Sequence, residues 1–166
     1  TIADAHAAVT VLFADVVGFT PFAERVGPED VVRVLDRIFS TFDDIADRHG
    51  LEKIKTIGDA YLLVGGLPAA RPDHVVAVAR AAFELIEATD RLAAETGSGL
   101  RIRIGMDSGP VVAGVIGRRK FSYDLWGATV NMASRMESNG ERDTVTLGPA
   151  AAARLAGSFR VVARAA

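Results

Sequence analysis

Cysteine is absent from the sequence, which excludes disulfide bonds, thiolate zinc sites and cysteine nucleophiles. The 19 Lys and Arg residues are outnumbered by 21 Asp and Glu residues, so no excess positive charge is available for general nucleic-acid binding. No apolar run approaches the ~20 residues that span a bilayer, and residues 1–11 lack a signal-peptide pattern. Any polyanionic substrate must therefore be met by local charges and metal ions, and no membrane contact is expected.

The remaining composition is that of an ordinary globular protein. The 166 residues are 49% hydrophobic and 24% charged with only 6 prolines, which argues against disorder and low-complexity scaffolds. The length is close to that of one compact domain, so we expect a single domain over residues 1–166. Because the chain begins on Thr1 and stops after the apolar stretch Phe159–Ala166, we expect a catalytic piece of a longer protein.

Helical periodicity is clearest in two long segments, where apolar residues such as Val31, Leu35, Ile38 and Phe42 recur on one face. Each such segment predicts an amphipathic helix that packs on the core. The sequence predicts helices at Pro28–His49, from after Pro72-Asp73 to before Gly97, at about Thr129–Ser138, and in an Ala-rich run after Leu147.

Short β-branched and aromatic runs separated by turn residues predict the strands. Gly58-Asp59 is typical of a tight hairpin, and the cluster Asp107–Pro110 predicts a second one. The element order indicates an α+β domain whose helices pack on a mostly antiparallel sheet. The predicted strands are Val9–Ala14, Leu51–Ile57, Ala60–Val64, Arg101–Met106, Val111–Ile116, Thr144–Leu147 and a last one from Phe159.

Two aspartates are candidates for metal binding. Asp15 ends the first predicted strand and Asp59 tips a hairpin, so neighbouring strands would bring the two carboxylates together. Paired carboxylates beside a phosphate-bearing substrate suit Mg²⁺. The turn after Asp15 opens a helix at Phe19 and Thr20, whose backbone N–H groups suit phosphate oxygens. The alternative is that Asp15 is a helix N-cap and Asp59 an ordinary turn residue.

Three further polar residues stand among apolar ones. Lys55 lies in a strand-like segment, where it either donates to a substrate or extends to water from an edge strand. Asn131 and Arg135 are four apart on a predicted helix and share a face, which suits a ribose and a phosphate. The alternative for this pair is a solvated surface helix.

Other common sites are not indicated. The sequence has no Walker A motif and no strand-associated G-x-G-x-x-G, so a P-loop NTPase or a Rossmann dehydrogenase is not expected. His6, His49 and His74 lack metal-ligand spacing. We interpret His49 as a charge near a helix C-terminus and the other two as surface residues.

Long motifs identify the family that the chain resembles. VTVLFADVVGFTPFAE, EKIKTIGDAYLLVGGLP and RIGMDSGPVVAGVIGRRKFSYDLWGATVNMASRME closely resemble the class III nucleotidyl cyclase catalytic domain, especially its adenylyl cyclases. They cover almost the whole chain in the family's order, which is far more specific than one short motif. The resemblance implies the family's ferredoxin-like α+β fold.

The resemblance also implies roles for individual residues. Asp15 and Asp59 match the two metal-binding aspartates, with the Val16 backbone carbonyl as an additional ligand to two Mg²⁺ or Mn²⁺ ions. Lys55 and Asp124 match the pair that reads adenine. In the guanylyl cyclases Glu and a small residue typically replace this pair, so the chain looks specific for ATP.

In this family Asn131 and Arg135 match the transition-state residues, which orient the ribose and neutralise charge on phosphorus. The implied reaction converts ATP to 3′,5′-cyclic AMP and pyrophosphate. The implied site is shared: one chain supplies the aspartates and the other supplies Lys55, Asp124, Asn131 and Arg135. A homodimer would therefore hold two equivalent sites, while a monomer would be nearly inactive.

One departure keeps alternatives open. Family members carry a phosphate-binding lysine in a last hairpin beyond a strand like Phe159–Arg164, and the 166 residues do not reach it. The alternatives to an adenylyl cyclase are a catalytically weak nucleotide-binding or dimerisation module and a guanylyl cyclase. We expect the domain to lie in the cytoplasm. This expectation also holds if the domain is the catalytic part of a longer, membrane-attached protein. The sequence does not indicate the regulator, the affinity of the dimer or the preferred metal.

Overall fold

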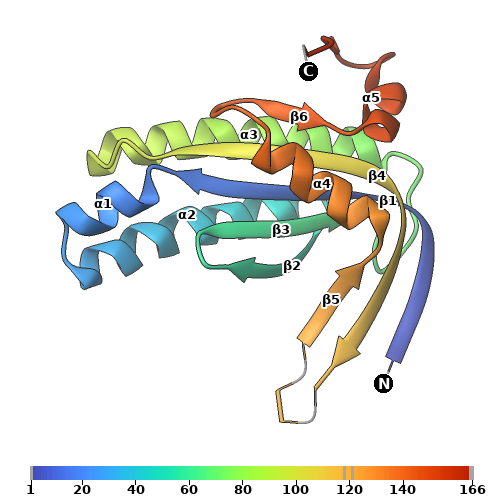
Figure 1. Ribbon diagram of the computed structural model, residues 1–166, viewed down its shortest axis with the longest axis horizontal. Coiled ribbons are helices and arrows are strands. Elements are labelled where there is room, and N and C mark those ends of the chain that lie inside the picture. The colour runs from blue at the N-terminus through green and yellow to red at the C-terminus, as the bar shows by residue number, and fades with distance from the viewer. Residues whose placement is uncertain (1, 118, 121, 165–166) are drawn as a thin grey trace.

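The computed structural model describes residues 2–117, 119–120 and 122–164 (Figure 1). In these residues strands and helices follow each other in a mixed order, which confirms an α+β fold. The elements are β1 (Ile2–Val17), α1 (Phe19–Arg25), α2 (Pro28–Arg48), β2 (Glu52–Ile57), β3 (Ala60–Gly65), α3 (His74–Thr96), β4 (Arg101–Ile116), β5 (Ser122–Trp126), α4 (Ala128–Ser138), β6 (Val145–Leu147) and α5 (Pro149–Leu155).

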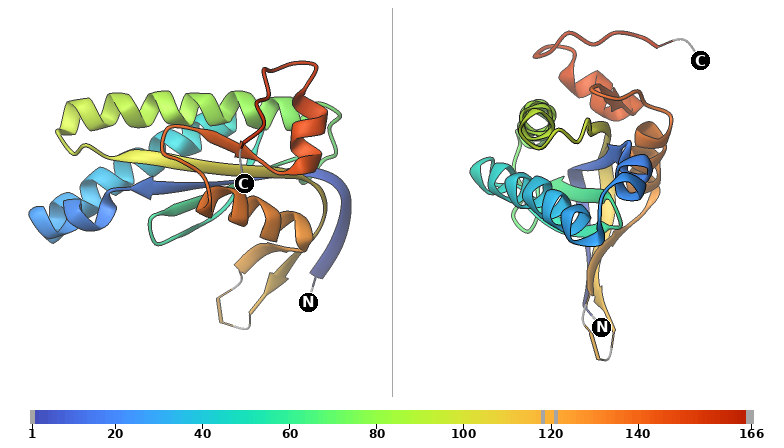
Figure 2. Two further views of the ribbon diagram at one scale, coloured as in Figure 1. Left: turned by 45° about the horizontal axis from the view of Figure 1, so that its top comes forward. Right: turned by 90° about the vertical axis from the view of Figure 1, so that its left-hand side faces the viewer.

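The strands form one sheet in the order β2-β3-β1-β4-β5, with antiparallel neighbours throughout, and β6 pairs in parallel with β4. Helices cover both faces of the sheet (Figure 2). α2, α3 and α5 pack on one face over the larger hydrophobic cluster, and α4 packs on the other face over the smaller one. The fold is therefore layered, with β1 and β4 at its centre.

Strand alternation decides which side chains meet α4. Leu12, Ala14 and Val16 of β1 belong to the larger cluster, while Val11 and Phe13 belong to the cluster under α4. Because successive side chains of a strand point to opposite faces, Asp15 lies on the same face as α4. The first carboxylate is thus placed by the pleat of β1.

The predicted hairpin at Asp107–Pro110 is wrong, because these residues lie inside the continuous strand β4. The polar side chains of Asp107 and Ser108 form hydrogen bonds with buried groups of the protein instead of with water. Asp107 accepts a hydrogen bond from the backbone N–H of Ala151 at 3.1 Å, and Ser108 lies 2.7 Å from the Thr10 hydroxyl. Gly109, at φ 152°, pairs with Val9 where the register of β1 shifts. The turn residues therefore mark an irregularity in two paired strands, and the hairpin that follows joins β4 to β5.

Three other predictions need correction. β5 was not predicted at all, since Ser122 and Asp124 interrupt its apolar pattern, and β1 begins seven residues before the predicted start at Val9. No strand forms from Phe159 to Arg164. The Phe159 ring stacks on Phe83 of α3, with the ring centroids 6.0 Å apart, so this segment covers a helix instead of extending a sheet edge.

His74 is not the surface residue that we expected, because only 2% of it is exposed. Its Nδ1 lies 2.7 Å from the Thr10 hydroxyl, and its Nε2 lies 3.4 Å from an Arg154 guanidinium nitrogen. Burial, and then the positive charge of Arg154, lower the pKa of His74 below its usual value of 6.5. Folding therefore disfavours the protonated form of this ring.

This burial predicts a pH dependence of stability. The unfolded chain takes up a proton on His74 near pH 6.5, and the folded chain takes it up less readily because the pKa of His74 is lowered there. The free energy of unfolding should therefore fall as the pH drops below about 6.5. His74→Asn should flatten that part of the curve measured by urea denaturation. His6→Asn, which removes a histidine at a half-buried position on β1, is the matched control, and equal flattening by both variants would contradict this account.

Gly105 allows α4 to approach β4 closely. A Cβ atom at this position would overlap the backbone nitrogen of Glu137 and lie 2.6 Å from the carbonyl oxygen of Ala133. We expect Gly105→Ala to lower the free energy of unfolding by about 1–3 kcal/mol, because α4 must move away from the sheet. Gly157→Ala, where a Cβ would meet nothing within 4 Å, is the control for urea denaturation. Equal stability of the two variants would contradict this account.

Candidate functional site

The two candidate metal-binding aspartates lie next to each other. Asp15 pairs with Ala60 of β3, and the backbone N–H of Val16 donates to the carbonyl of Asp59 at 3.0 Å. In an extended strand the N–H and C=O of one residue point to the same side, so the Val16 carbonyl also faces the β2–β3 hairpin. The end of β1 and the hairpin tip thus bring two carboxylates and one backbone carbonyl together.

Burial and, to a smaller extent, nearby negative charge raise the pKa of Asp15 to about 7. Burial of the carboxyl is the main cause, followed by the charge of Asp59 and a hydrogen bond with Glu137, while the positive charge of Arg103 opposes the shift. Arg103 Nη2 donates to Asp15 Oδ2 at 3.2 Å, and its Nε donates to Glu137 Oε1 at 3.1 Å. The single positive charge of Arg103 therefore does not balance the negative charges of Asp15, Asp59 and Glu137.

These residues fit a hard divalent cation such as Mg²⁺ or Mn²⁺. The donors are carboxylate and carbonyl oxygens, which both metals prefer, and a cation would relieve the repulsion between Asp15 and Asp59. Within residues 2–117, 119–120 and 122–164 no group of three or more His, Cys, Asp or Glu residues is arranged around a metal position. Substrate and water oxygens would have to complete the shell, as is usual for Mg²⁺.

The predicted phosphate site directly follows β1 in the chain. Gly18, at φ 85°, precedes the first residue of α1, and Phe19 and Thr20 open that helix. The Phe19 side chain packs against the larger hydrophobic cluster, so only its backbone N–H is available to a ligand, whereas Thr20 is exposed. Any contact with phosphate here would therefore come from the backbone of Phe19 and from Thr20.

Lys55 and Asp124 meet although their strands form opposite ends of the main strand order. Lys55 Nζ lies 2.6 Å from Asp124 Oδ2, and the side chains are 39% and 22% exposed. The sheet curls around the smaller hydrophobic cluster, which includes Leu62 and Leu125, so β2 approaches β5 (Figure 1). The ion pair therefore lies where β2 and β5 approach each other, and it is accessible to a ligand.

Asn131 and Arg135 project from α4 one turn apart, and both are exposed. Among the described residues neither side chain has a recorded hydrogen bond or ion pair. No such contact joins the aspartates, the Lys55–Asp124 pair and these two residues to one another within the same part of the chain. The structure thus gathers the predicted residues into three separate groups on the α4 face.

Arg103 and Glu137 were missed by sequence reasoning. Arg103 is 88 residues from Asp15, and only the register of β1 and β4, which pairs these two residues, reveals the contact. Glu137 is charged, yet it lies one turn after the buried Ala133 on α4, and only 8% of it is exposed. The signal that could have found it is Gly105, whose missing side chain lets α4 approach the sheet.

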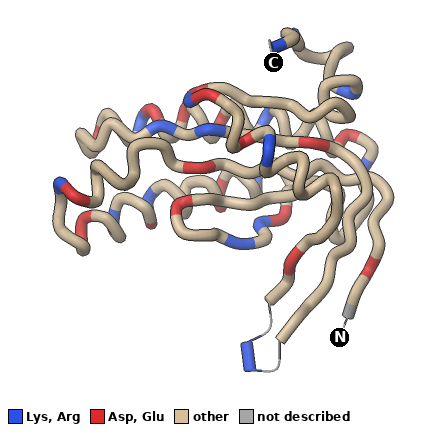
Figure 3. The backbone as a smooth tube through the Cα atoms, in the orientation of Figure 1, with Lys and Arg blue, Asp and Glu red and all other residues tan. Residues whose placement is uncertain are grey.

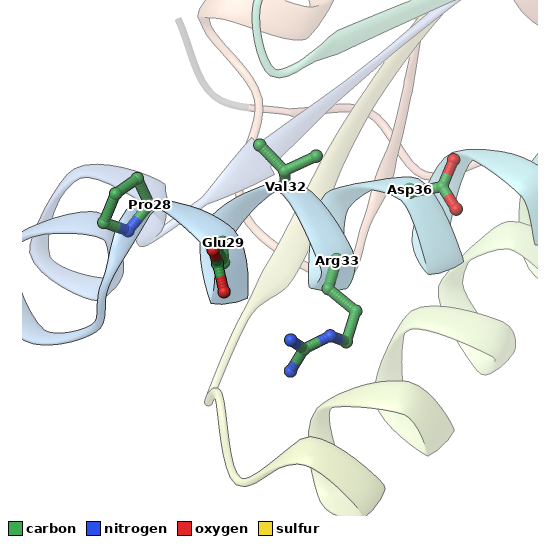
Figure 4. Close-up of a pocket in the computed structure, with 5 residues that line it drawn as sticks. All are labelled: Pro28, Glu29, Val32, Arg33 and Asp36. Carbon is green, nitrogen blue, oxygen red and sulfur yellow. The ribbon is translucent and has the colours of Figure 1, made fainter.

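A separate hollow lies on the outer side of α2, lined by Pro28, Glu29, Val32, Arg33 and Asp36 (Figure 4). It contains none of the predicted site residues.

Basic and acidic positions are interspersed along the described chain (Figure 3), in keeping with the small net charge of −2. None of the helices within the described residues has the length and hydropathy needed to cross a bilayer.

The curled, mostly antiparallel sheet carries the paired aspartates and the polar face of α4, as the resemblance to a nucleotidyl cyclase catalytic domain predicts. The family model for the adenylate and guanylate cyclase catalytic domain matches residues 2–166, and the chain belongs to this family. The resemblance seen in the sequence is confirmed.

Relatives with different substrates in their names are similar to the chain. An adenylate cyclase of Mycobacterium tuberculosis is 51% identical over 137 residues, covering 82% of this chain and 31% of the relative. A membrane guanylyl cyclase of Dictyostelium discoideum is 41% identical over 145 residues, covering 87% of this chain and 10% of the relative. The chain thus spans less than a third of the length of either of these relatives.

Solved structures confirm the fold. The guanylate cyclase domain of a rhodopsin-guanylyl cyclase from Catenaria anguillulae, in complex with GTP, has a TM-score of 0.90 and 38% identity, covering 95% of this chain and 86% of that one. The catalytic core of a rhodopsin-guanylyl cyclase with converted specificity, in complex with ATPαS, has a TM-score of 0.92 and 39% identity, covering 96% and 87%. The class III cyclase fold is therefore shared along nearly the whole chain.

Proposed function

We propose that the chain is an adenylyl cyclase domain that converts ATP to 3′,5′-cyclic AMP and pyrophosphate. The ribose 3′-oxygen forms a bond to the α-phosphorus, the bond from that phosphorus to pyrophosphate breaks, and the hydroxyl proton passes to solvent. The observation that carries the choice of ATP is the contact of 2.6 Å between Lys55 and Asp124.

This pair suits adenine because its two members offer opposite hydrogen-bonding groups. The Lys55 ammonium only donates, which matches a ring nitrogen, and the Asp124 carboxylate only accepts, which matches the exocyclic amine. Guanine has a carbonyl in place of this amine and a protonated nitrogen in place of this ring acceptor. In the same position, guanine would leave one or both protein groups unpaired. An unpaired group in a partly closed site costs affinity, and ATP is therefore favoured.

The other two groups supply the remaining chemistry. Asp15, Asp59 and the Val16 carbonyl would hold two Mg²⁺ or Mn²⁺ ions, which supply charge stabilisation at the reacting phosphate when bound. Backbone N–H groups at Phe19 and Thr20 donate hydrogen bonds to phosphate oxygens. Asn131 orients the ribose, and Arg135 neutralises the charge that develops on the phosphate.

A homodimer would complete the site. Asn131 and Arg135 are exposed, and no recorded contact links them to the aspartates of the same described chain, as expected if each faces a second copy. Large apolar side chains are exposed on the β4–β5 arm, which supports burial against a partner. They are Val112, Ile116, Tyr123 and Trp126. Two equivalent sites would then form about a two-fold axis.

Cyclic AMP formation from ATP and Mn²⁺, measured over a wide range of protein concentration, tests the proposal. Specific activity should rise with concentration as dimers form, and Asp59→Ala should abolish it. No product at any concentration would favour a nucleotide-binding or dimerisation module. A preference for GTP in competition would make the chain a guanylyl cyclase, the activity named for the Dictyostelium relative. We expect the domain to work in the cytoplasm as part of a longer protein.

A further inference from the structure

A chain of ion pairs connects the aspartate corner to α4. Arg103 stands between two carboxylates and donates to Asp15 at 3.2 Å and to Glu137 at 3.1 Å. The Glu137 side chain is only 11% exposed, so water competes weakly for it, and Ser138 donates to its other oxygen at 3.3 Å. Glu137 therefore holds Arg103 from a fixed position.

The position of Glu137 is fixed by backbone packing. Gly105 lies two residues after Arg103 on β4 and faces the same helix, where its missing side chain admits the backbone of Glu137. α4 also packs closely on both β1 and β4. The fixed carboxylate of Glu137 therefore resists movement of the Arg103 side chain toward Asp15.

We propose that Glu137 is a positioning residue that draws Arg103 away from Asp15, so that a divalent cation can replace Arg103 there. Arg103 acts as a built-in counter-ion of Asp15 and Glu137 as its second acceptor. When a cation reaches Asp15, Arg103 keeps a charged partner instead of being left unpaired, which lowers the cost of the exchange. This inference rests on the proposed function for the metal-binding role of Asp15.

The same contact links two half-sites of one chain. Glu137 follows Arg135 by two residues on α4, and in the proposed dimer Arg135 serves one active site while Asp15 serves the other. The contact between Arg103 and Glu137 therefore joins the metal half-site of one active site to the transition-state half-site of the next. A change at Asp15 has a direct path of two ion pairs to α4.

A double-mutant cycle on metal affinity tests this role. Binding of Mn²⁺ alone is followed by electron paramagnetic resonance in the nucleotide-free chain, for the unchanged protein, Glu137→Gln, Arg103→Met and the double variant. Asp15→Asn defines the contribution of Asp15 to binding. Glu141→Gln, the same charge change at an exposed position nearby, is the matched control, and thermal unfolding checks that each variant is folded.

We expect Glu137→Gln to weaken Mn²⁺ binding about threefold to tenfold, because Arg103 then pairs with Asp15 alone. In the Arg103→Met background the same change should have less than half of this effect on the free energy of binding. Equal effects in both backgrounds would mean that Glu137 acts only through its charge and would overturn the proposal. So would a Glu137→Gln variant that binds like Glu141→Gln, or an Asp15→Asn variant that binds Mn²⁺ unchanged.

The cycle also separates this inference from the proposed function. A chain that shows the coupling but forms no cyclic nucleotide contradicts the cyclase and supports the role of Glu137. A chain that is an active cyclase but shows no coupling leaves the proposed function standing and removes the positioning role.

Discussion

Mixing two inactive variants, Asp59→Ala and Arg135→Ala, should restore about a quarter of the original activity. Each change removes one half of both sites in its own homodimer. At equal amounts, about half of the dimers contain one chain of each kind, and such a dimer has one intact site out of two. The measurement is cyclic AMP formation from ATP and Mn²⁺ at a protein concentration that favours dimers.

A second mixture gives the control. Asp59→Ala and Asp15→Ala damage the same half-site, so every dimer that they form lacks the carboxylate pair at both sites. This mixture should stay inactive at all ratios. Recovery in the control mixture, or none in the first, would contradict a site shared between chains in the proposed way.

The second large effect is a change of base preference. Lys55→Glu combined with Asp124→Gly should lower the ratio of kcat/KM for ATP to that for GTP by about 100-fold. The new glutamate can accept from the guanine ring, and glycine removes the carboxylate that faces the guanine carbonyl. Competition between the two nucleotides, with separation of cyclic AMP from cyclic GMP, measures the ratio directly.

Lys53→Glu is the matched control for this switch. Lys53 lies on the same strand and makes its own ion pair with Asp43 at 3.1 Å, away from Asp124. It should change stability slightly and leave the nucleotide ratio unchanged. A double variant at Lys55 and Asp124 that keeps the original ratio would mean that the base is recognised elsewhere.

The sequence predicted the elements whose pattern is local. The helices at α2, α3 and α4 and the β2–β3 hairpin were found because amphipathic periodicity and a Gly-Asp turn are written in consecutive residues. The nearness of Asp15 and Asp59 also followed, since a strand end and a hairpin tip meet when their strands pair. The roles of these residues are still predictions.

What failed depends on distant contacts. Asp107 and Ser108 are typical turn residues, and only the buried partners supplied by Ala151 and Thr10 explain their place inside a strand. His74 was taken for a surface residue because its partner, Thr10, is 64 residues away. Arg103 escaped notice for the same reason, since its contact with Asp15 depends on strand register.

The central position of β1 also bears on how the chain folds. Val11 pairs with Val64 on one side and with Asp107 on the other, so β1 is synthesised before both of the strands with which it pairs and must wait for them. Such non-local pairing slows folding relative to helical proteins of similar length. Until β4 has been synthesised, the alternating apolar residues of β1 stay exposed, and this interval is when the nascent chain most needs protection from aggregation.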